Sequence, residues 1–341
     1  STMRALFIHG KQQASVDEVP MPEPGNGQVR LRMAYAGICG SDIHYYFDGA
    51  NGTFVVREPL VPGHEVSGTV DLDPSGTYEP GTPVTVHPAT FGEPLAGIEG
   101  EEFKHLWPGG SYLGSASTWP HTQGGMQEYL IVEDYMIRTL PEGMSLKAAA
   151  LAEPLAVGLH GIELGGGVEG KKVLVAGSGP IGLLLAAAAV VRGASEVVCT
   201  DMLPGPLERA KAVGATSVVQ VGVGELPDSH FDIAFECSGA PSSVSSCIAA
   251  TRRAGQIVQV GMMPAGEKPI VYAPFIQREQ RLVGSFRFNE EISDAVEMLA
   301  AHPELENVIT HIFGADDFVA AFDAAKDSDA SGKVLVELWT D

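Results

Sequence analysis

Residues 171–182 read KKVLVAGSGPIG, and this stretch decides the fold of the middle of the chain. The apolar run at its start is typical of a buried strand, and the residues from the proline onward begin a long apolar helix pattern. Between them lies a G-x-G-x-x-G turn, whose glycines allow a tight turn, close approach of a pyrophosphate and close helix packing. The residues predicted to bind a dinucleotide here are Gly177, Gly179, Pro180, Ile181 and Gly182.

Asp201 lies 22 residues after Gly179, at the end of the next strand pattern. A carboxylate there would bind the adenine ribose hydroxyls and repel a 2′-phosphate, so the sequence favours NAD over NADP. The nearest following arginine is Arg209. The alternative is a glycine turn in a sheet that binds no nucleotide.

Strand and helix patterns alternate from 171 to about 285, which predicts an α/β domain with a doubly wound parallel sheet. Within it, SSVSSCIAATRRAG, residues 242–255, is expected to be a helix. The preceding pattern, residues 145–162, predicts a helix broken at Pro154. We place the nucleotide-binding domain at 151–285.

The first 150 residues are rich in glycine, proline and short β-type runs such as QVRLRMAYAG and HEVSGTVDL. The closing segment, 286–341, carries two helix patterns and the run KVLVEL. We expect it to join residues 1–150 in a β-rich domain.

The 341 residues contain 43 acidic and 21 basic side chains, a formal net charge of −22. Such a charge repels nucleic acids and anionic membranes, so neither is an expected partner. Residues 173–191 are apolar for nearly the length of a membrane span, but their glycines and proline favour a strand, turn and helix. The N-terminal residues lack a secretory pattern and the four cysteines form no CxxC pair, which predicts a reducing cytoplasm.

Four side chains of metal-ligand type follow one another along the chain: Cys39, His64, Glu65 and Glu153. One thiolate, one imidazole and a carboxylate suit an open catalytic zinc site. Each residue alone has a simpler interpretation, because single cysteines are often core residues and single glutamates are often solvated.

Six motifs carry a resemblance to a known family: GICGSDIH, VPGHEVSG, GGMQEY, AEPLAV, GSGPIG and ECSG. Together they resemble the zinc-containing medium-chain alcohol dehydrogenase superfamily nearly end to end. Four further runs, HYYFDGANGTFVVREPLVPGHE, FECSGAPSSVSSC, VQVGM and GSFRF, are similar to its polyol branch and above all to the L-idonate 5-dehydrogenases. The resemblance implies a GroES-like catalytic domain, a Rossmann domain and a homodimer or homotetramer.

The resemblance also implies roles for individual residues. Cys39, His64 and Glu65 match zinc ligands, and Glu153 matches a carboxylate that reaches zinc directly or through water. Ser41 and His44 match the hydroxyl and histidine that carry away the substrate proton. The positions that match substrate contacts are Tyr45 and Arg287. The positions that match the wall around the nicotinamide are Cys237, Val260, Gly261 and Met262.

The chain departs from this family in one region. Most relatives hold a second, structural zinc with four closely spaced cysteines, whereas residues 88–112 contain no cysteine. His87 and His105 lack ligand spacing. We therefore expect one zinc per chain and a lobe held by packing of Phe103, Leu106 and Trp107.

The glycine turn and the metal-ligand residues support hydride transfer with NAD, and the resemblance implies that the substrate is a secondary alcohol of a sugar acid, as in the oxidation of L-idonate to 5-keto-D-gluconate. The bound zinc would lower the pKa of the alcohol, and Arg287 would bind the substrate carboxylate. Three alternatives remain: a neutral polyol substrate such as sorbitol or xylitol, a zinc-free quinone or enoyl reductase, and a non-catalytic nucleotide-binding protein.

Overall fold

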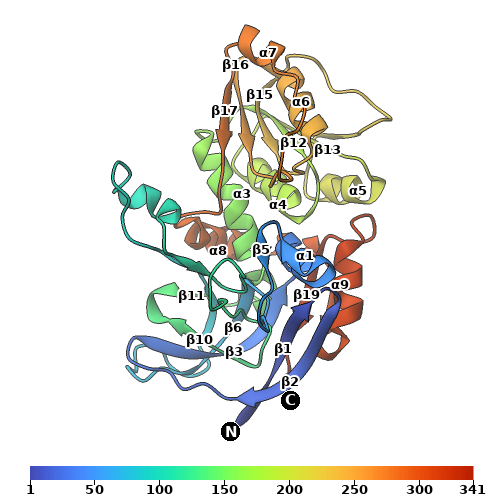
Figure 1. Cartoon of the computed structure of the whole chain (residues 1–341). Coiled ribbons are helices and arrows are strands. Elements are labelled where there is room, and N and C mark those ends of the chain that lie inside the picture. The colour runs from blue at the N-terminus through green and yellow to red at the C-terminus, as the bar shows by residue number, and fades with distance from the viewer. Residues whose placement is uncertain (341) are drawn as a thin grey trace. The chain divides into compact units, whose positions relative to one another are not determined.

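The computed structural model describes residues 1–340, and its contacts divide the chain into two compact units (Figure 1). Unit 1 comprises Ser1–Glu153, Ile292–Asp327 and the chain from Lys333 onward. Unit 2 comprises Pro154–Glu291 and Ser328–Gly332. The second segment of unit 2 lies within the stretch that the sequence analysis assigns to the β-rich domain.

Unit 1 is built on a seven-stranded sheet in the order β11-β7-β6-β3-β19-β18, with β10 also paired to β3. Alternating burial along the central strand β3 turns its apolar side chains into the core. The strands of this sheet are β3 (Gln28–Gly37), β6 (Glu65–Leu72), β7 (Pro83–Val86), β10 (Tyr129–Glu133), β11 (Ile137–Thr139), β18 (Ile309–Gly314) and β19 (Lys333–Glu337). The two-stranded sheets are β1 (Thr2–Gly10) with β2 (Gln13–Pro20), β4 (Ala50–Asn51) with β5 (Phe54–Val55), and β8 (Ala89–Thr90) with β9 (Ser111–Tyr112).

Helices are few in unit 1, and α2 and α9 contact strands of this sheet. They are α1 (Gly40–Asp48), α2 (Leu146–Ala149), α8 (Glu291–Ala301) and α9 (Phe318–Lys326). Short 3₁₀ helices are η1 (Glu101–Leu106), η2 (Asp134–Met136), η3 (Pro303–Val308) and η4 (Ala315–Asp317). The core joins residues from both ends of the chain, such as Leu31, Phe322 and Val336. The C-terminal segment therefore completes the β-rich core.

Unit 2 is a six-stranded parallel sheet in the order β14-β13-β12-β15-β16-β17. Its strands are β12 (Lys172–Ala176), β13 (Glu196–Asp201), β14 (Ser217–Gln220), β15 (Phe231–Glu236), β16 (Thr251–Gln259) and β17 (Arg281–Gly284). Its helices are α3 (Ala152–Leu164), α4 (Pro180–Val191), α5 (Pro204–Ala212), α6 (Pro241–Ala250) and α7 (Ala273–Gln277). The strand order reverses between β12 and β15, which is where doubly wound sheets bind their ligands. The predicted Rossmann architecture is confirmed.

Two element predictions are wrong in detail. The predicted helix over 242–255 ends at Ala250, because Thr251 takes an extended conformation and begins β16 beside Phe231. The chain is not broken at Pro154, which lies in the first turn of α3, where a proline sacrifices no helical hydrogen bond.

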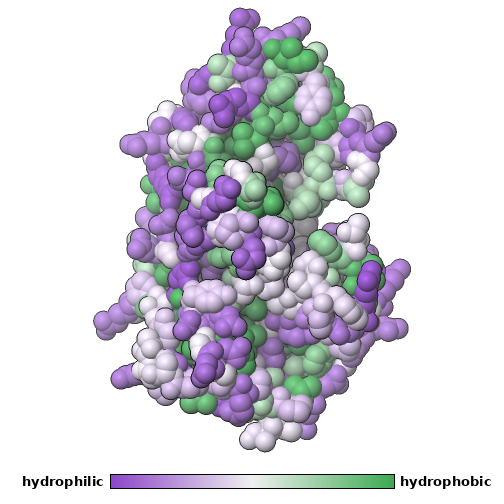
Figure 2. Space-filling view, turned by 60° about the vertical axis from the view of Figure 1, so that its left-hand side comes forward, coloured by the Kyte–Doolittle hydropathy of each residue, from purple (hydrophilic) through white to green (hydrophobic). Residues whose placement is uncertain are grey.

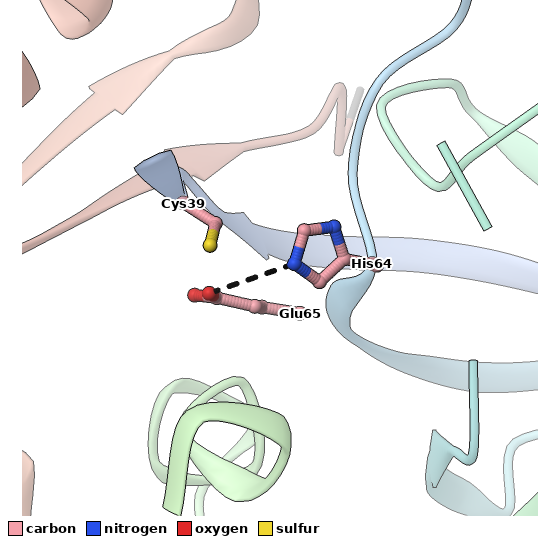
Figure 3. Close-up of side chains that lie close together, drawn as sticks. All are labelled: Cys39, His64 and Glu65. Carbon is pink, nitrogen blue, oxygen red and sulfur yellow. Dashed lines mark ion pairs between the residues drawn. The ribbon is translucent and has the colours of Figure 1, made fainter. Parts of the chain in front are cut away.

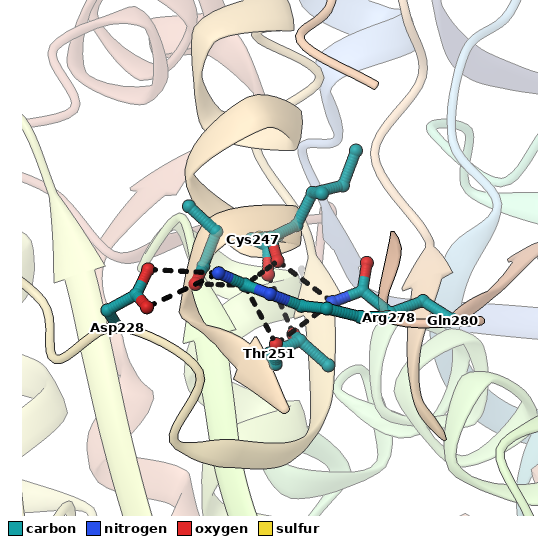
Figure 4. A network of polar contacts seen from close by, with 7 residues as sticks. Asp228, Cys247, Thr251, Arg278 and Gln280 are labelled. Carbon is teal, nitrogen blue, oxygen red and sulfur yellow. Dashed lines mark hydrogen bonds and ion pairs between the residues drawn. The ribbon is translucent and has the colours of Figure 1, made fainter. Parts of the chain in front are cut away.

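Arg278 ties the end of α6 to the following strand (Figure 4). Its guanidinium donates hydrogen bonds to the carbonyl oxygens of Ile248, Ala249 and Thr251 at 2.7–3.2 Å, and it forms an ion pair with the exposed Asp228. These bonds satisfy carbonyls that have no partner within the helix.

Polar side chains cover much of the face shown in Figure 2, as the excess of acidic residues leads one to expect. Unit 2 nevertheless exposes some large apolar side chains, among them Met262, Val271 and Ile276. Among the described residues, no helix combines the length and the apolar character that crossing a membrane requires.

Candidate metal centre and nucleotide site

Cys39 lies at the junction of β3 and α1, where it is the N-cap residue of the helix. The main-chain N–H of Cys39 donates to Asp42 Oδ2 at 2.9 Å, and Asp42 is fully buried. Burial raises the pKa of Asp42 despite this bond and the nearby His64. The cap therefore fixes the thiol beside a buried carboxyl group that the sequence analysis did not single out.

His64 and Glu65 follow a turn whose conformation depends on glycine. Gly63 has φ of 109°, and the backbones of Gly114 and Gly124 lie so close to it that neither could carry a side chain. Glu65 begins β6 opposite Gly37 of β3, and a Cβ on Gly37 would collide with Glu65 Oε1. These glycines leave room for the two functional side chains.

Cys39, His64 and Glu65 converge in unit 1 (Figure 3). Their candidate ligand atoms all lie within 4.8 Å of one another, and His64 Nε2 is 3.9 Å from Glu65 Oε2. Burial would lower the pKa of His64, but Glu153 and Cys39 outweigh it and raise this pKa well above its ordinary value. The structure thus brings together three of the four predicted ligands.

Lys333, at the start of β19, provides a cation for Glu65. Its ammonium lies 2.7 Å from Glu65 Oε1, donates to the carbonyl of Ile38 at 2.9 Å, and is 2% exposed. Burial alone would lower the pKa of Lys333. The nearby carboxylate of Glu65 outweighs burial and raises this pKa above its ordinary value, so the lysine is charged. Glu65 Oε2 is buried without a hydrogen-bond donor. That oxygen is free to ligate a metal.

Glu153 has a different environment from Glu65. Its Oε2 accepts a hydrogen bond of 2.5 Å from the hydroxyl of Tyr112 and lies 3.6 Å from His64 Nε2. Burial raises the pKa of Glu153, and the neighbouring His64 partly opposes this. Glu153 is not in the group of mutually close ligand atoms. It lies beside the three-residue cluster.

One half-buried thiol, one buried imidazole and one buried carboxylate with an unsatisfied oxygen match the donor set of a catalytic zinc site. The three residues would hold the ion, and a fourth position would remain open. No second group of three or more metal-ligand side chains comes together within residues 1–340.

The cysteine-free lobe is held by other contacts. Trp107 donates its indole N–H to the carbonyl of Ile98 at 2.7 Å, and Lys104 lies 4.8 Å from the centre of the Phe91 ring. Phe103 and Leu106 are 36% and 45% exposed, so the prediction that they form the packed interior of the lobe is wrong. Trp107, the third predicted residue, stabilises the lobe through its hydrogen bond to Ile98.

Ser41 and His44 lie on α1, three residues apart and therefore on one face of the helix. His44 is largely exposed, and its Nδ1 is 2.9 Å from Asp48 Oδ2.

Tyr45 is buried, and its hydroxyl accepts a hydrogen bond from the N–H of Ala116. The substrate-contact role of Tyr45 stays a prediction.

In unit 2, the glycine turn follows β12 and opens α4. Gly177 has φ of 95°, and a Cβ on Gly182 would collide with the carbonyl of Gly177. A Cβ on Gly179 would meet no atom within 4 Å, so this glycine leaves open space at the N-terminus of the helix. Asp201 accepts hydrogen bonds of 3.0 Å from the N–H groups of Ser178 and Leu203. These features fit a dinucleotide phosphate cradle with a carboxylate at its edge.

The loops after β15 and β16 adjoin this turn. A Cβ on Gly177 would lie 2.8 Å from Ser238 N, and one on Gly261 would lie 2.5 Å from Gly239 N. The predicted nicotinamide-wall residues Cys237, Val260, Gly261 and Met262 thus belong to neighbouring loops at the carboxyl ends of the strands. Arg287 has φ of 49° and its guanidinium lies over the ring of Phe286.

Three residues of the metal region were absent from the sequence analysis: Asp42, Tyr112 and Lys333. Asp42 carries a usable signal, since its position three residues into a helix beginning at Cys39 is that of a capping box. Tyr112 and Lys333 are distant in sequence from their partners, and no local pattern marks them.

Comparisons with known proteins agree with this geometry. Residues 25–142 match the family model of the alcohol dehydrogenase GroES-like domain, and residues 180–301 match that of the zinc-binding dehydrogenase. The chain is 37% identical to L-idonate 5-dehydrogenase (NAD(P)(+)) of Escherichia coli over 87% of each chain. It is 34% identical to human sorbitol dehydrogenase, over 94% of this chain and 92% of the other.

A solved structure shows the same fold. The crystal structure of L-idonate 5-dehydrogenase from Escherichia coli superposes with a TM-score of 0.93 and 32% identity, covering 99% of this chain and 98% of that one. The chain therefore belongs to the zinc-dependent, NAD(P)-linked polyol and sugar-acid dehydrogenases of the medium-chain alcohol dehydrogenase superfamily.

Proposed function

We propose that this protein transfers hydride between NAD and a secondary alcohol of a sugar acid, of the L-idonate and 5-keto-D-gluconate type. The observation that carries the proposal is the convergence of the half-buried Cys39 with the buried His64 and Glu65 in a chain 37% identical to an L-idonate 5-dehydrogenase. The neutral polyols are the second candidate, because human sorbitol dehydrogenase is 34% identical over a larger share of the chain.

We infer one zinc ion per chain, held by Cys39, His64 and Glu65. A zinc ion there supplies Lewis acidity, which lowers the pKa of a bound alcohol. We infer that Ser41 accepts the alcohol proton and that His44 passes it to solvent, which is supported by their shared helix face and by the exposure of His44.

We infer NAD rather than NADP as the cofactor. The carboxylate of Asp201 lies at the edge of the glycine turn, where it would repel a 2′-phosphate. Arg209 does not compensate, since its guanidinium donates to the carbonyls of Ser328, Asp329 and Ser331.

The test is an NAD-coupled assay with L-idonate, 5-keto-D-gluconate, sorbitol and xylitol, each with and without a chelator. Turnover of the sugar acids that the chelator abolishes and zinc restores would support the proposal. Faster turnover of sorbitol or xylitol would make the protein a polyol dehydrogenase. Full activity after metal removal would instead indicate a zinc-free reductase, and no NADH signal with any substrate would favour a non-catalytic nucleotide-binding protein.

Metal analysis tests the ligand set and the zinc count independently of substrate. Cys39→Ala should weaken zinc binding by more than about 100-fold. Cys199→Ala is the matched control, because Cys199 is buried on β13 and does not belong to the group of metal-ligand side chains. Two zinc ions per chain would contradict the single-site proposal.

The assembly and compartment are also proposals. Exposed apolar side chains on unit 2, including Val271 and Ile276, are suited to burial between copies in a homodimer or homotetramer. Light scattering of the purified protein would give its mass. The cytoplasm remains the predicted compartment.

A further inference from the structure

Tyr112 ends the cysteine-free lobe and reaches the metal centre. It lies on β9, which pairs with β8 through Ala89 and Tyr112, and the N–H of Leu113 donates to the carbonyl of Pro88 at 2.9 Å. This small sheet closes the base of the lobe. The side chain of Tyr112 is 5% exposed, and its ring centre is 5.5 Å from that of His64.

The hydroxyl of Tyr112 donates a hydrogen bond to one of the two carboxylate oxygens of Glu153. It donates to Oε2 at 2.5 Å, and this is the oxygen that lies 3.6 Å from His64 Nε2. A phenol donating to a carboxylate at this distance makes a strong, charge-assisted hydrogen bond. The Glu153 oxygen nearest to His64 is therefore already held by the tyrosine.

The two glutamates of the site thus have different partners. Glu65 faces an ammonium, that of Lys333, and keeps Oε2 without a donor. Glu153 accepts a hydrogen bond at Oε2 from the neutral hydroxyl of Tyr112, and the same oxygen lies 3.6 Å from His64 Nε2. If both glutamates ligated a zinc ion together with the cysteine and the histidine, four protein ligands would fill its usual coordination shell. No position would remain for a substrate alcohol.

We propose that Tyr112 is a positioning residue that holds Glu153 out of the metal coordination shell and so keeps one position open for the substrate hydroxyl. This inference rests on the proposed zinc-dependent function, and it assigns to the lobe a role in delivering Tyr112. Removal of the phenolic hydroxyl would release Glu153 to become a fourth ligand.

Cobalt-substituted full-length protein provides the test, because the visible absorption of Co²⁺ depends on the number and type of its ligands. Added imidazole is the probe of the open position. In wild type, imidazole should shift the cobalt bands. In Tyr112→Phe the bands should differ before imidazole is added, and the shift should require at least about 10-fold more imidazole or be lost. Turnover of the zinc enzyme should fall by about 10- to 100-fold with zinc content retained.

Two further variants separate positioning from packing. In Glu153→Gln the competing carboxylate is gone, so adding Tyr112→Phe to it should change neither the cobalt bands nor the imidazole response. Tyr46→Phe is the control, since Tyr46 is equally buried but packs against Phe47 and Phe322. It should behave as wild type.

Several outcomes would overturn the role of Tyr112. Wild-type bands and imidazole response in Tyr112→Phe would do so, as would an effect of the same size in the Glu153→Gln background. If Tyr112→Phe does not fold, the Glu153→Gln single variant still decides: it should keep the wild-type imidazole response, and loss of that response would show that Glu153 acts as a ligand. A wild-type protein that binds no cobalt would instead defeat the proposed function as well.

Discussion

Replacing Lys333 with methionine should strongly destabilise the metal-free protein. Lys333 is 2% exposed and its ammonium lies 2.7 Å from Glu65 Oε1, while Glu65 itself is 1% exposed. Removing one partner of a buried ion pair leaves an uncompensated charge, which costs about 3–5 kcal/mol. Because the folded pKa of Lys333 lies above its ordinary 10.5, this contribution is present at neutral pH and is lost only in strong alkali.

Zinc should reduce this loss, and a second substitution should cancel most of it. A divalent ion bound to Glu65 compensates the same carboxylate, so Lys333→Met should cost clearly less in zinc-loaded protein than in chelator-treated protein. In the double variant Lys333→Met/Glu65→Gln no charge is left unpaired, and its metal-free stability should return to within about 1–2 kcal/mol of wild type.

Urea unfolding followed by tryptophan fluorescence suits this measurement, because all three tryptophans, Trp107, Trp119 and Trp339, belong to unit 1. The signal therefore reports on the unit that contains Lys333. The exposed Lys11 provides the control, and Lys11→Met should change stability by less than about 0.5 kcal/mol. A metal-free Lys333→Met protein within about 1 kcal/mol of wild type would refute the reasoning, as would a double variant no more stable than the single one.

Two other predictions concern stability away from the metal. Arg278→Met should destabilise unit 2 by about 1–2 kcal/mol, because it removes hydrogen bonds from a charged group to the carbonyls of Ile248, Ala249 and Thr251. The loss stays moderate because each carbonyl keeps a second donor, from Gln280 or from the N–H of Ser229. Asp228→Asn should cost less than about 0.5 kcal/mol since Asp228 is 74% exposed, and hydrogen exchange of α6 amides distinguishes the two variants. Burial would raise the pKa of Glu128, but two hydrogen bonds from Arg4 lower it below 4.5, so Glu128 stabilises the fold above about pH 4.5 and this contribution is lost as the pH falls. Glu128→Gln should therefore cost about 1 kcal/mol at neutral pH and almost nothing near pH 3, and a pH-independent difference in urea unfolding would contradict it.

The nucleotide-binding half could be predicted from sequence because its signals are local. The strand, the glycine turn and the helix that begins at Pro180 are contiguous, and Asp201 follows at the end of the next strand. The error at Thr251 also reflects reliance on local signals: the alanines at the end of α6 favour a helix, and nothing local marks where a parallel strand must begin. Pairing with Phe231 decides that point, and it is a tertiary contact.

The candidate metal centre could be predicted only in part, because its proposed ligands lie in short local motifs but their partners do not. Cys39, His64 and Glu65 belong to two short motifs that are recognisable by residue type. Tyr112 is 41 residues from Glu153, and Lys333 reads as the solvated first residue of an apolar strand. The burial of Lys333 follows from the pairing of β19 with β3, which a sequence pattern does not reveal.

The choice between a sugar acid and a neutral polyol depends on which cation would bind a substrate carboxylate. The cluster in unit 1 is rich in carboxylates, and its nearby lysine, Lys333, is already paired with Glu65. A substrate carboxylate therefore gains nothing from Lys333 and requires another cation, for which Arg287 is the predicted residue. Arg287→Ala should then raise KM for L-idonate by at least about 10-fold more than KM for sorbitol, since only the acid loses an ion pair. Equal changes in the two KM values would remove the case for a sugar acid and leave the polyol as the better substrate class.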